Sequence, residues 1–102
     1  MELSVLELKE LIDRGEVTLV DVREPHEVEV CKIKGSVFIP MREISNQINK
    51  LDVEKEHAIT CHSGVRSLHV VNYLIAHGYQ ALNVSGGIDM WASIVDKDMK
   101  RY

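Results

Sequence analysis

The chain has 102 residues, 45% of them hydrophobic, which is enough for one domain whose core needs no disulfide or metal to hold it together. Its formal net charge of -4 and its lack of long basic runs argue against nucleic acid or an anionic membrane surface as the main partner. No apolar stretch approaches the roughly 20 residues of a membrane span, and the first residues lack the pattern of a secretory leader, so we expect a cytoplasmic protein.

Helical and strand patterns alternate from the first residues onward. Ser4 and Glu7 form a capping-box pattern that opens a helix, and Gly15 ends it. Residues 17–22 are nearly continuous in apolar side chains, as in a strand covered on both faces. Further helices are expected from about Glu24 to Cys31, at 41–50, at 68–75 and at 88–95, and further strands at 36–39, at the run that ends in Thr60, and at 80–84.

This alternation predicts the fold class. In so short a chain, strands that alternate with helices imply right-handed crossovers and a mostly parallel sheet with helices on both faces. No internal repeat or linker divides the chain. We therefore expect a single α/β domain over residues 1–102, with its core at about 3–95 and a polar tail at 96–102 that frays.

The most informative segment is Cys61-His62-Ser63-Gly64-Val65-Arg66-Ser67, which joins a buried strand to a helix. The first N–H groups of a helix have no partner within it and attract negative charge, so a thiolate at this junction is stabilised. Helix N-termini and cations can bring a thiol pKa from about 8.5 down to roughly 3.5–7.5. Arg66 adds a planar, charged fork that suits a tetrahedral oxyanion, and Gly64 allows a tight turn. Cys61 is therefore a candidate nucleophile, although a lone cysteine at a strand end is also often a buried core residue.

A charged pair stands at the end of the first long strand. Asp21 and Arg23 lie at the edge at which open α/β sheets bind ligands. A structural salt bridge is the simpler interpretation of this pair, and a supporting role at the site is the other.

Four motifs, in this order, resemble those of the rhodanese family of sulfurtransferases. Asp21-Val22-Arg23-Glu24 with Glu27 resembles the family's first motif, and Gly35 through Ile39-Pro40 resembles its second. The segment from Cys61 to Ser67 resembles the active-site loop. Gly86-Gly87 followed by Trp91 resembles the closing motif, in which the glycines allow close approach and the tryptophan packs. The resemblance spans about residues 3 to 95.

The resemblance to a single-domain rhodanese implies a three-layer fold with a central, mostly parallel five-stranded sheet flanked by helices on both faces. It also implies that Cys61 takes the outer sulfur of a donor such as thiosulfate as a persulfide, and yields it to cyanide, a thiol or a sulfur-accepting protein. The implied binding loop holds the donor and the persulfide, with Arg66 docking the anion, and consists of His62, Ser63, Gly64, Val65 and Arg66. Asp21, Arg23 and Ser67 would support it. The scheme needs no cofactor, metal, nucleic acid or membrane.

Other functions are weighed on the residues. A zinc site at His57, Cys61 and His62 is disfavoured, because strand residues four apart lie roughly 13 Å apart, too far for one zinc ion. A phosphatase or arsenate reductase on the same sheet would place five residues between cysteine and arginine, whereas four separate Cys61 from Arg66. A catalytically silent rhodanese-like interaction module would be expected to lack the cysteine.

Cys31 has two interpretations. It stands in Cys31-Lys32-Ile33-Lys34, where many family members have a Gly-His pair before the isoleucine. It is either a half-buried packing residue near a helix end or a resolving or relay thiol for Cys61, and packing is the commoner fate of such a cysteine. In a cytoplasmic chain the two cysteines are expected to be thiols rather than a disulfide.

Overall fold

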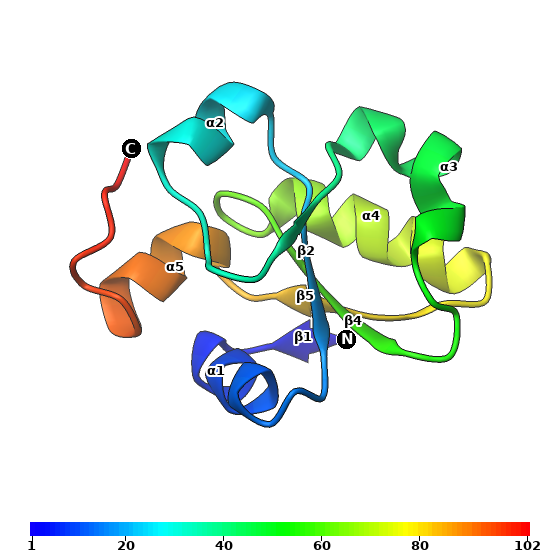
Figure 1. Ribbon diagram of the computed structural model, residues 1–102, viewed down its shortest axis with the longest axis horizontal. Helices are drawn as coiled ribbons and strands as arrows, with labels where there is room; N and C mark the ends of the chain where they lie inside the picture. The colour runs from blue at the N-terminus through cyan, green and yellow to red at the C-terminus, as the bar shows by residue number, and fades with distance from the viewer.

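The computed structural model describes residues 1–102 and has an α/β architecture, with a central sheet between two layers of helices (Figure 1). The sheet has five strands in the order β1-β5-β4-β2-β3. They are β1 Glu2–Leu3, β2 Thr18–Asp21, β3 Val37–Phe38, β4 Glu56–Thr60 and β5 Gln80–Val84. Every pairing is parallel, and Asp21 of β2 is in register with Thr60 of β4. The carboxyl ends of the central strands therefore meet at one edge.

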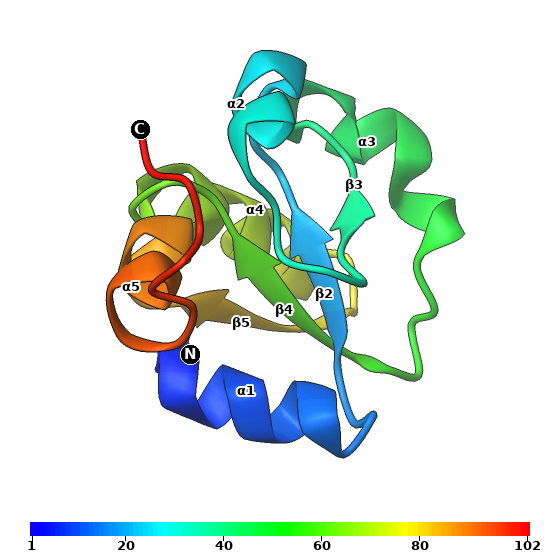
Figure 2. The ribbon, with the colours of Figure 1, turned by 60° about the vertical axis from the view of Figure 1, so that its left-hand side comes forward.

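The helices lie on both faces of the sheet. They are α1 Val5–Asp13, α2 Pro25–Val30, α3 Ile44–Gln47, α4 Val65–Ala76 and α5 Gly87–Ile94. Figures 1 and 2 show α1 and α5 on one face, α3 and α4 on the other, and α2 beyond the carboxyl end of β2. None of these helices is both long and apolar enough to cross a membrane.

Two hydrophobic cores form because neighbouring strand residues face opposite sides. In β4, Ala58 packs in the core beneath α1 and α5, whereas Ile59 packs in the core beneath α4. Both side chains are fully buried. Burial of a large aliphatic side chain contributes about 1.5–3 kcal/mol, and the continuous apolar pattern of the strands follows from burial on both faces.

The expected fold is confirmed, with two differences in its elements. The sequence pattern did not predict β1, because a strand of two residues is too short to show a period; it pairs with Asn83 and Val84 of β5. The helix expected at 41–50 is broken into a 3₁₀ turn at Met41–Glu43, the short α3, and a second 3₁₀ turn at Ile48–Lys50. This segment is rich in serine and asparagine, whose side chains compete for backbone hydrogen bonds and weaken a helix.

Candidate active site at Cys61

Cys61 directly follows β4, and α4 begins at Val65. The turn between them depends on Gly64, which has a φ of 103° and lies in the left-handed region. A Cβ atom on this glycine would lie 3.3 Å from the backbone nitrogen of Gly86, closer than an ordinary contact. Glycine therefore allows both the backbone angle and the close approach that bring α4 directly after the cysteine.

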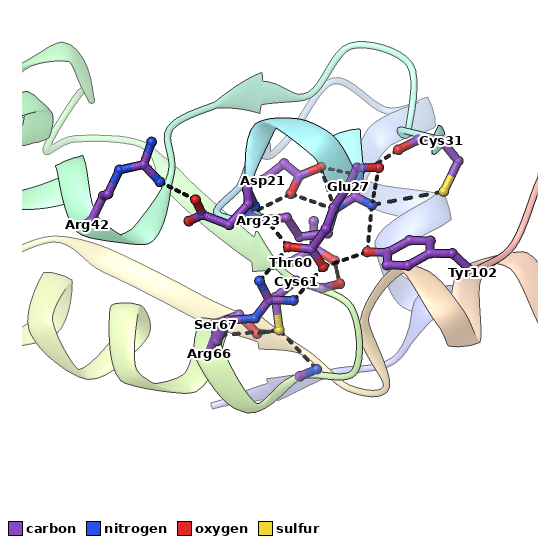
Figure 3. A network of polar contacts seen from close by, with 12 residues as sticks. Asp21, Arg23, Glu27, Cys31, Arg42, Thr60, Cys61, Arg66, Ser67 and Tyr102 are labelled. Atoms are coloured by element: carbon purple, nitrogen blue, oxygen red, sulfur yellow. Dashed lines mark hydrogen bonds and ion pairs between the residues drawn. The ribbon is translucent and has the colours of Figure 1, made fainter. Parts of the chain in front are cut away.

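The Cys61 sulfur lies inside a ring of hydrogen-bond donors (Figure 3). The backbone N–H groups of Gly64 and Ser67 donate to Sγ, with N to Sγ distances of 3.1 and 3.4 Å. The Ser67 hydroxyl oxygen lies 3.3 Å from the same sulfur. Cys61 is only 1% exposed, so water contributes little to solvation of its charge. These donors take the place of water around a thiolate.

The hydrogen bonds decide the ionisation of this thiol. Burial on its own would raise the pKa of Cys61, because a thiolate loses its hydration. The Ser67 hydroxyl and the backbone N–H groups of Ser67, Gly64 and Ser63 outweigh burial and hold the pKa of Cys61 below its ordinary value. The start of α4 and its preceding turn thus favour the thiolate, and the downward direction of the pKa shift is the one predicted for a cysteine at this strand-to-helix junction.

A polar chain continues behind Ser67 to the first strand. The Ser67 hydroxyl donates to Asn83 Oδ1 at 2.5 Å, and Asn83 Nδ2 donates to Gly64 O at 3.1 Å. The same Nδ2 lies 3.2 Å from each carboxylate oxygen of Glu2. Since Glu2 and the Gly64 carbonyl only accept, they fix the amide with its oxygen toward Ser67. When Cys61 is ionised, the one hydrogen of the Ser67 hydroxyl is therefore shared between two acceptors, Asn83 Oδ1 and Cys61 Sγ.

The first turn of α5 holds the other side of the loop. The N–H groups of Ile88 and Asp89 donate to the carbonyl oxygens of Cys61 and His62 at 2.9 and 3.0 Å. This contact needs glycine at position 87, where a Cβ atom would lie 2.5 Å from Cys61 O. Trp91 anchors the helix in the core and is 6% exposed. The close approach and the packing expected for the two glycines and the tryptophan are both present.

Arg66 is held by a carboxylate from another helix. Its Nη1 and Nη2 donate to Oε1 and Oε2 of Glu27 at 2.6 and 2.8 Å (Figure 3). These bonds, with partial burial opposing them, lower the pKa of Glu27 from 4.5 to about 2 and raise the pKa of Arg66 above its ordinary value. The pair therefore stays ionised at all physiological pH values. The docking of a donor anion by Arg66 stays a prediction, and the structure adds that the guanidinium is already paired with Glu27.

Asp21 and Arg23 form a buried salt bridge, with Nη2 of Arg23 2.7 Å from Oδ2 of Asp21. The guanidinium also donates to the carbonyl oxygens of Glu27 and Cys31, at 3.3 and 2.7 Å. Neither Asp21 nor Arg23 touches the Cys61 sulfur. They join the end of β2 to the middle of α2, at Glu27, and to Cys31 directly after this helix. The supporting role that the resemblance implies for them stays a prediction.

The last residue of the polar tail contacts the site, and that the tail frays stays a prediction. Tyr102 donates its hydroxyl hydrogen to Glu27 Oε2 at 2.9 Å and accepts from Arg23 Nη1 at 3.0 Å. Its ring stacks on His62, with ring centroids 4.3 Å apart. Polar composition alone gave no sign of these contacts. They depend on the buried Arg23 and on a Glu27 oxygen that can accept a further hydrogen bond, and both residues are more than 70 positions away in sequence.

The remaining expected residues lie around the mouth of the loop. His62 is half-buried beneath the Tyr102 ring, whereas Ser63 and Val65 are exposed. Cys31 is half-buried, with its sulfur 3.9 Å from Nη1 of Arg23. Cys31 and Cys61 are both free thiols, held by different sets of neighbours. No group of three His, Cys, Asp or Glu side chains is arranged to hold a metal ion.

Comparison with known proteins identifies the family. The rhodanese-like domain matches residues 4–94. The chain belongs to the rhodanese-like family. It is 41% identical over 91 residues to Bacillus subtilis YtwF, whose name proposes sulfurtransferase activity, and the match covers 88% of each chain. It is also 36% identical over 83 residues to a sulfurtransferase of Allochromatium vinosum, covering 80% of this chain and 78% of that one.

The fold comparison agrees. The human single-domain sulfurtransferase TSTD1 superposes with a TM-score of 0.84 at 28% sequence identity, over 91% of this chain and 96% of that one. The resemblance seen in the four sequence motifs is therefore confirmed, and so is the three-layer fold that it implied.

Proposed function

We propose that this rhodanese-like protein is a sulfurtransferase that carries sulfane sulfur as a persulfide on Cys61. The donor is a molecule with a sulfane sulfur, of which thiosulfate is the simplest, and the acceptor is cyanide, a thiol or a sulfur-accepting protein. The proposal includes a cytoplasmic location, since both cysteines are free and thiols persist in reducing compartments.

The observation that supports the proposal most is the convergence of donors on the Cys61 sulfur. The N–H groups of Gly64 and Ser67 and the Ser67 hydroxyl all lie 3.1 to 3.4 Å from Sγ. Such donors stabilise an anionic sulfur, both the attacking thiolate and the persulfide that follows it. Relatives named as sulfurtransferases match most of the chain, which favours the same chemistry.

The proposed cycle has two displacements. The Cys61 thiolate attacks the outer sulfur of the donor, a new S–S bond forms on Cys61, and the donor S–S bond breaks with its electron pair leaving on sulfite or on a thiolate. The acceptor then attacks the terminal sulfur of the persulfide, and the Cys61 thiolate leaves. Cys61 is restored, so no cofactor is consumed.

Two competing functions are weighed against this one. A phosphatase or arsenate reductase needs a longer loop between cysteine and arginine, and in this protein the arginine fork is already paired with Glu27. A silent interaction module would need no activated cysteine, whereas the pKa of Cys61 is lowered by its neighbours.

The test follows the sulfur on the protein. After incubation with a sulfane donor and removal of excess, intact mass should show one added sulfur atom, which a thiol reductant or cyanide removes. Cys61→Ser should abolish this adduct and turnover, whereas the matched control Cys31→Ser should retain both. An adduct that persists in Cys61→Ser and disappears in Cys31→Ser would overturn the assignment of the nucleophile. Cys61-dependent hydrolysis of an aryl phosphate at a rate matching sulfur transfer would instead indicate a phosphatase.

A further inference from the structure

The carboxylate of Glu27 is fixed by hydrogen bonds in addition to its ion pair with Arg66. Four hydrogen bonds reach it: Oε1 accepts from Arg66 and from the backbone N–H of Glu24, and Oε2 accepts from Arg66 and from the Tyr102 hydroxyl. The Glu27 side chain is 11% exposed. An incoming anion would have to displace this fixed carboxylate before it could make the bidentate contact with Arg66.

The charge beside the Cys61 cradle is therefore balanced before a substrate arrives. Arg66 and Glu27 cancel, and Arg23 is paired with buried Asp21. Arg101 is paired with Asp89 at 2.7 Å, and Lys100 lines the cleft beside His62 without a hydrogen bond to the sulfur or to Arg66. The Cys61 sulfur itself is faced by neutral donors only, namely two backbone N–H groups and the Ser67 hydroxyl.

The outer edge of the loop is apolar rather than cationic. Val65 is 66% exposed, and Leu68, on the next turn of α4, is also exposed. These side chains offer an organic group a surface to pack on, and they offer nothing to a small, strongly hydrated anion.

From this balance we infer that Glu27 is a specificity-determining residue. Because it occupies the guanidinium of Arg66, the site binds the sulfonate of thiosulfate poorly and is suited to the persulfide of a thiol, R–S–SH. The inference rests on the proposed function and narrows its donor class. The Cys61 thiolate attacks the outer sulfur of R–S–SH, the Cys61–S bond forms as the donor S–S bond breaks, and R–S⁻ leaves with the electron pair. Cys61–S–SH keeps the hydrogen, and no oxidant or reductant is needed. Thiosulfate would bring two negative charges to the thiolate and release sulfite, also a dianion.

The test compares two donors in the wild type and in Glu27→Gln. The donors are thiosulfate and the persulfide of 2-mercaptoethanol, whose organic group carries no charge. Glu27→Gln keeps the shape of the side chain and exposes the charge of Arg66, so kcat/KM for thiosulfate should rise by about tenfold or more, mainly through KM. For the organic persulfide it should change by less than about threefold.

The matched control is Glu24→Gln, which removes one negative charge from the start of the same helix, where Glu24 pairs with Arg42. It should leave the preference between the two donors as it is in the wild type. An equal gain for thiosulfate in Glu24→Gln, or no gain in a folded Glu27→Gln protein, overturns the role of Glu27.

A second measurement needs no variant. Alkylation of wild-type Cys61 by iodoacetamide should keep its rate when millimolar sulfate is added, because the balanced pair does not hold an oxyanion. Protection by sulfate would overturn the inference even if Glu27→Gln did not fold. The proposed function fails on a different result, namely the absence of a Cys61 persulfide with either donor in the wild type.

Discussion

At the scale of single residues, one hydroxyl hydrogen lies between the Cys61 sulfur and the side-chain amide of Asn83. Ser67 lies 3.3 Å from Cys61 Sγ and 2.5 Å from Asn83 Oδ1. A thiolate gains from this hydroxyl only when the hydrogen turns toward sulfur, so Ser67 links ionisation of Cys61 to the hydrogen bonding of Asn83.

Removal of this hydroxyl should make Cys61 less acidic. Ser67→Ala is expected to raise the pKa of Cys61, because one of the bonds that stabilise the thiolate is lost. A hydrogen bond to a charged group contributes about 1.5–3 kcal/mol, so alkylation should slow by roughly tenfold or more at pH values below the pKa of the thiol, where the rate follows the thiolate fraction. The pH profile of alkylation by an uncharged reagent measures both effects.

Ser63→Ala provides the comparison, because the Ser63 side chain is exposed and its contribution to Cys61 comes from the backbone N–H, which alanine keeps. Its alkylation profile should match that of the wild type. A Ser63→Ala profile that shifts as far as that of Ser67→Ala would mean that the loop hydroxyl, rather than the one on α4, stabilises the thiolate.

Arg66 is expected to stabilise the fold more than it activates the thiol. In Arg66→Ala the Gly64 and Ser67 amides still face sulfur, so the pKa of Cys61 should remain below its ordinary value. The free energy of unfolding should fall by about 1–3 kcal/mol, since Glu27 is left with an uncompensated charge. Alkylation profiles and urea unfolding measure the two quantities. A thiol pKa that returns to the value of a free cysteine in Arg66→Ala would show that the arginine, and not the backbone, activates Cys61.

At the scale of elements, the first turn of α5 holds the Cys61 loop in place, and Gly87 is where the two backbones meet. Gly87→Ala would place a Cβ atom 2.5 Å from Cys61 O and 2.6 Å from His62 O, which requires the loop or the helix to move. A strained φ costs about 1–2 kcal/mol and overpacking about 1–3 kcal/mol, so we expect a loss of about 2–5 kcal/mol in unfolding free energy. Sulfur transfer should fall with it, because the donors around Sγ shift.

Gly78→Ala is the control for this prediction. Gly78 also has a positive φ, of 86°, but a Cβ atom there meets nothing within 4 Å. It should therefore lose only the cost of the backbone angle, about 1–2 kcal/mol, and keep its activity. Equal losses of stability in the two variants would indicate that the close contact of the new Cβ atom at position 87 with the loop adds nothing to the loss.

Sequence reasoning succeeded where the signal is local. The strand, turn and helix around Cys61 follow from an apolar run, a glycine and a helical period, and all of them are present. It could not predict the partner of Arg66, because the pairing with Glu27 joins residues 39 apart through the relative placement of α2 and α4. Glu27 was noticed only as part of a motif, and nothing in the pattern linked it to the loop. The roles of Asn83 and Tyr102 likewise depend on tertiary contacts.

At the scale of the whole molecule, acid stability should depend on Glu27. Its pKa in the folded protein is about 2, below its ordinary value of 4.5. The folded state therefore holds fewer protons, and this contribution to stability is fully present above pH 4.5 and is lost as pH falls toward 2. Since Arg66 is 35% exposed and water screens the pair, we expect a contribution on the order of 2 kcal/mol.

Chemical unfolding at a series of pH values measures this contribution. Between pH 4.5 and 2 the wild type should lose more stability than Glu27→Gln does, whatever the difference between the two proteins at neutral pH. Parallel curves for the two proteins would show that Glu27 is not the group whose protonation destabilises the fold.

The chain has a single tryptophan, and it lies on α5, the helix that holds the Cys61 loop. Trp91 is buried on α5, whose first amides hold the Cys61 and His62 carbonyls. A buried indole emits at shorter wavelength than one in water, so intrinsic fluorescence gives an optical readout of whether α5 is seated. If the emission moves to longer wavelength at a lower urea concentration than the loss of helical circular dichroism, the Cys61 loop is released before the sheet unfolds. If fluorescence and circular dichroism change at the same urea concentration, α5 and the sheet unfold as one cooperative unit.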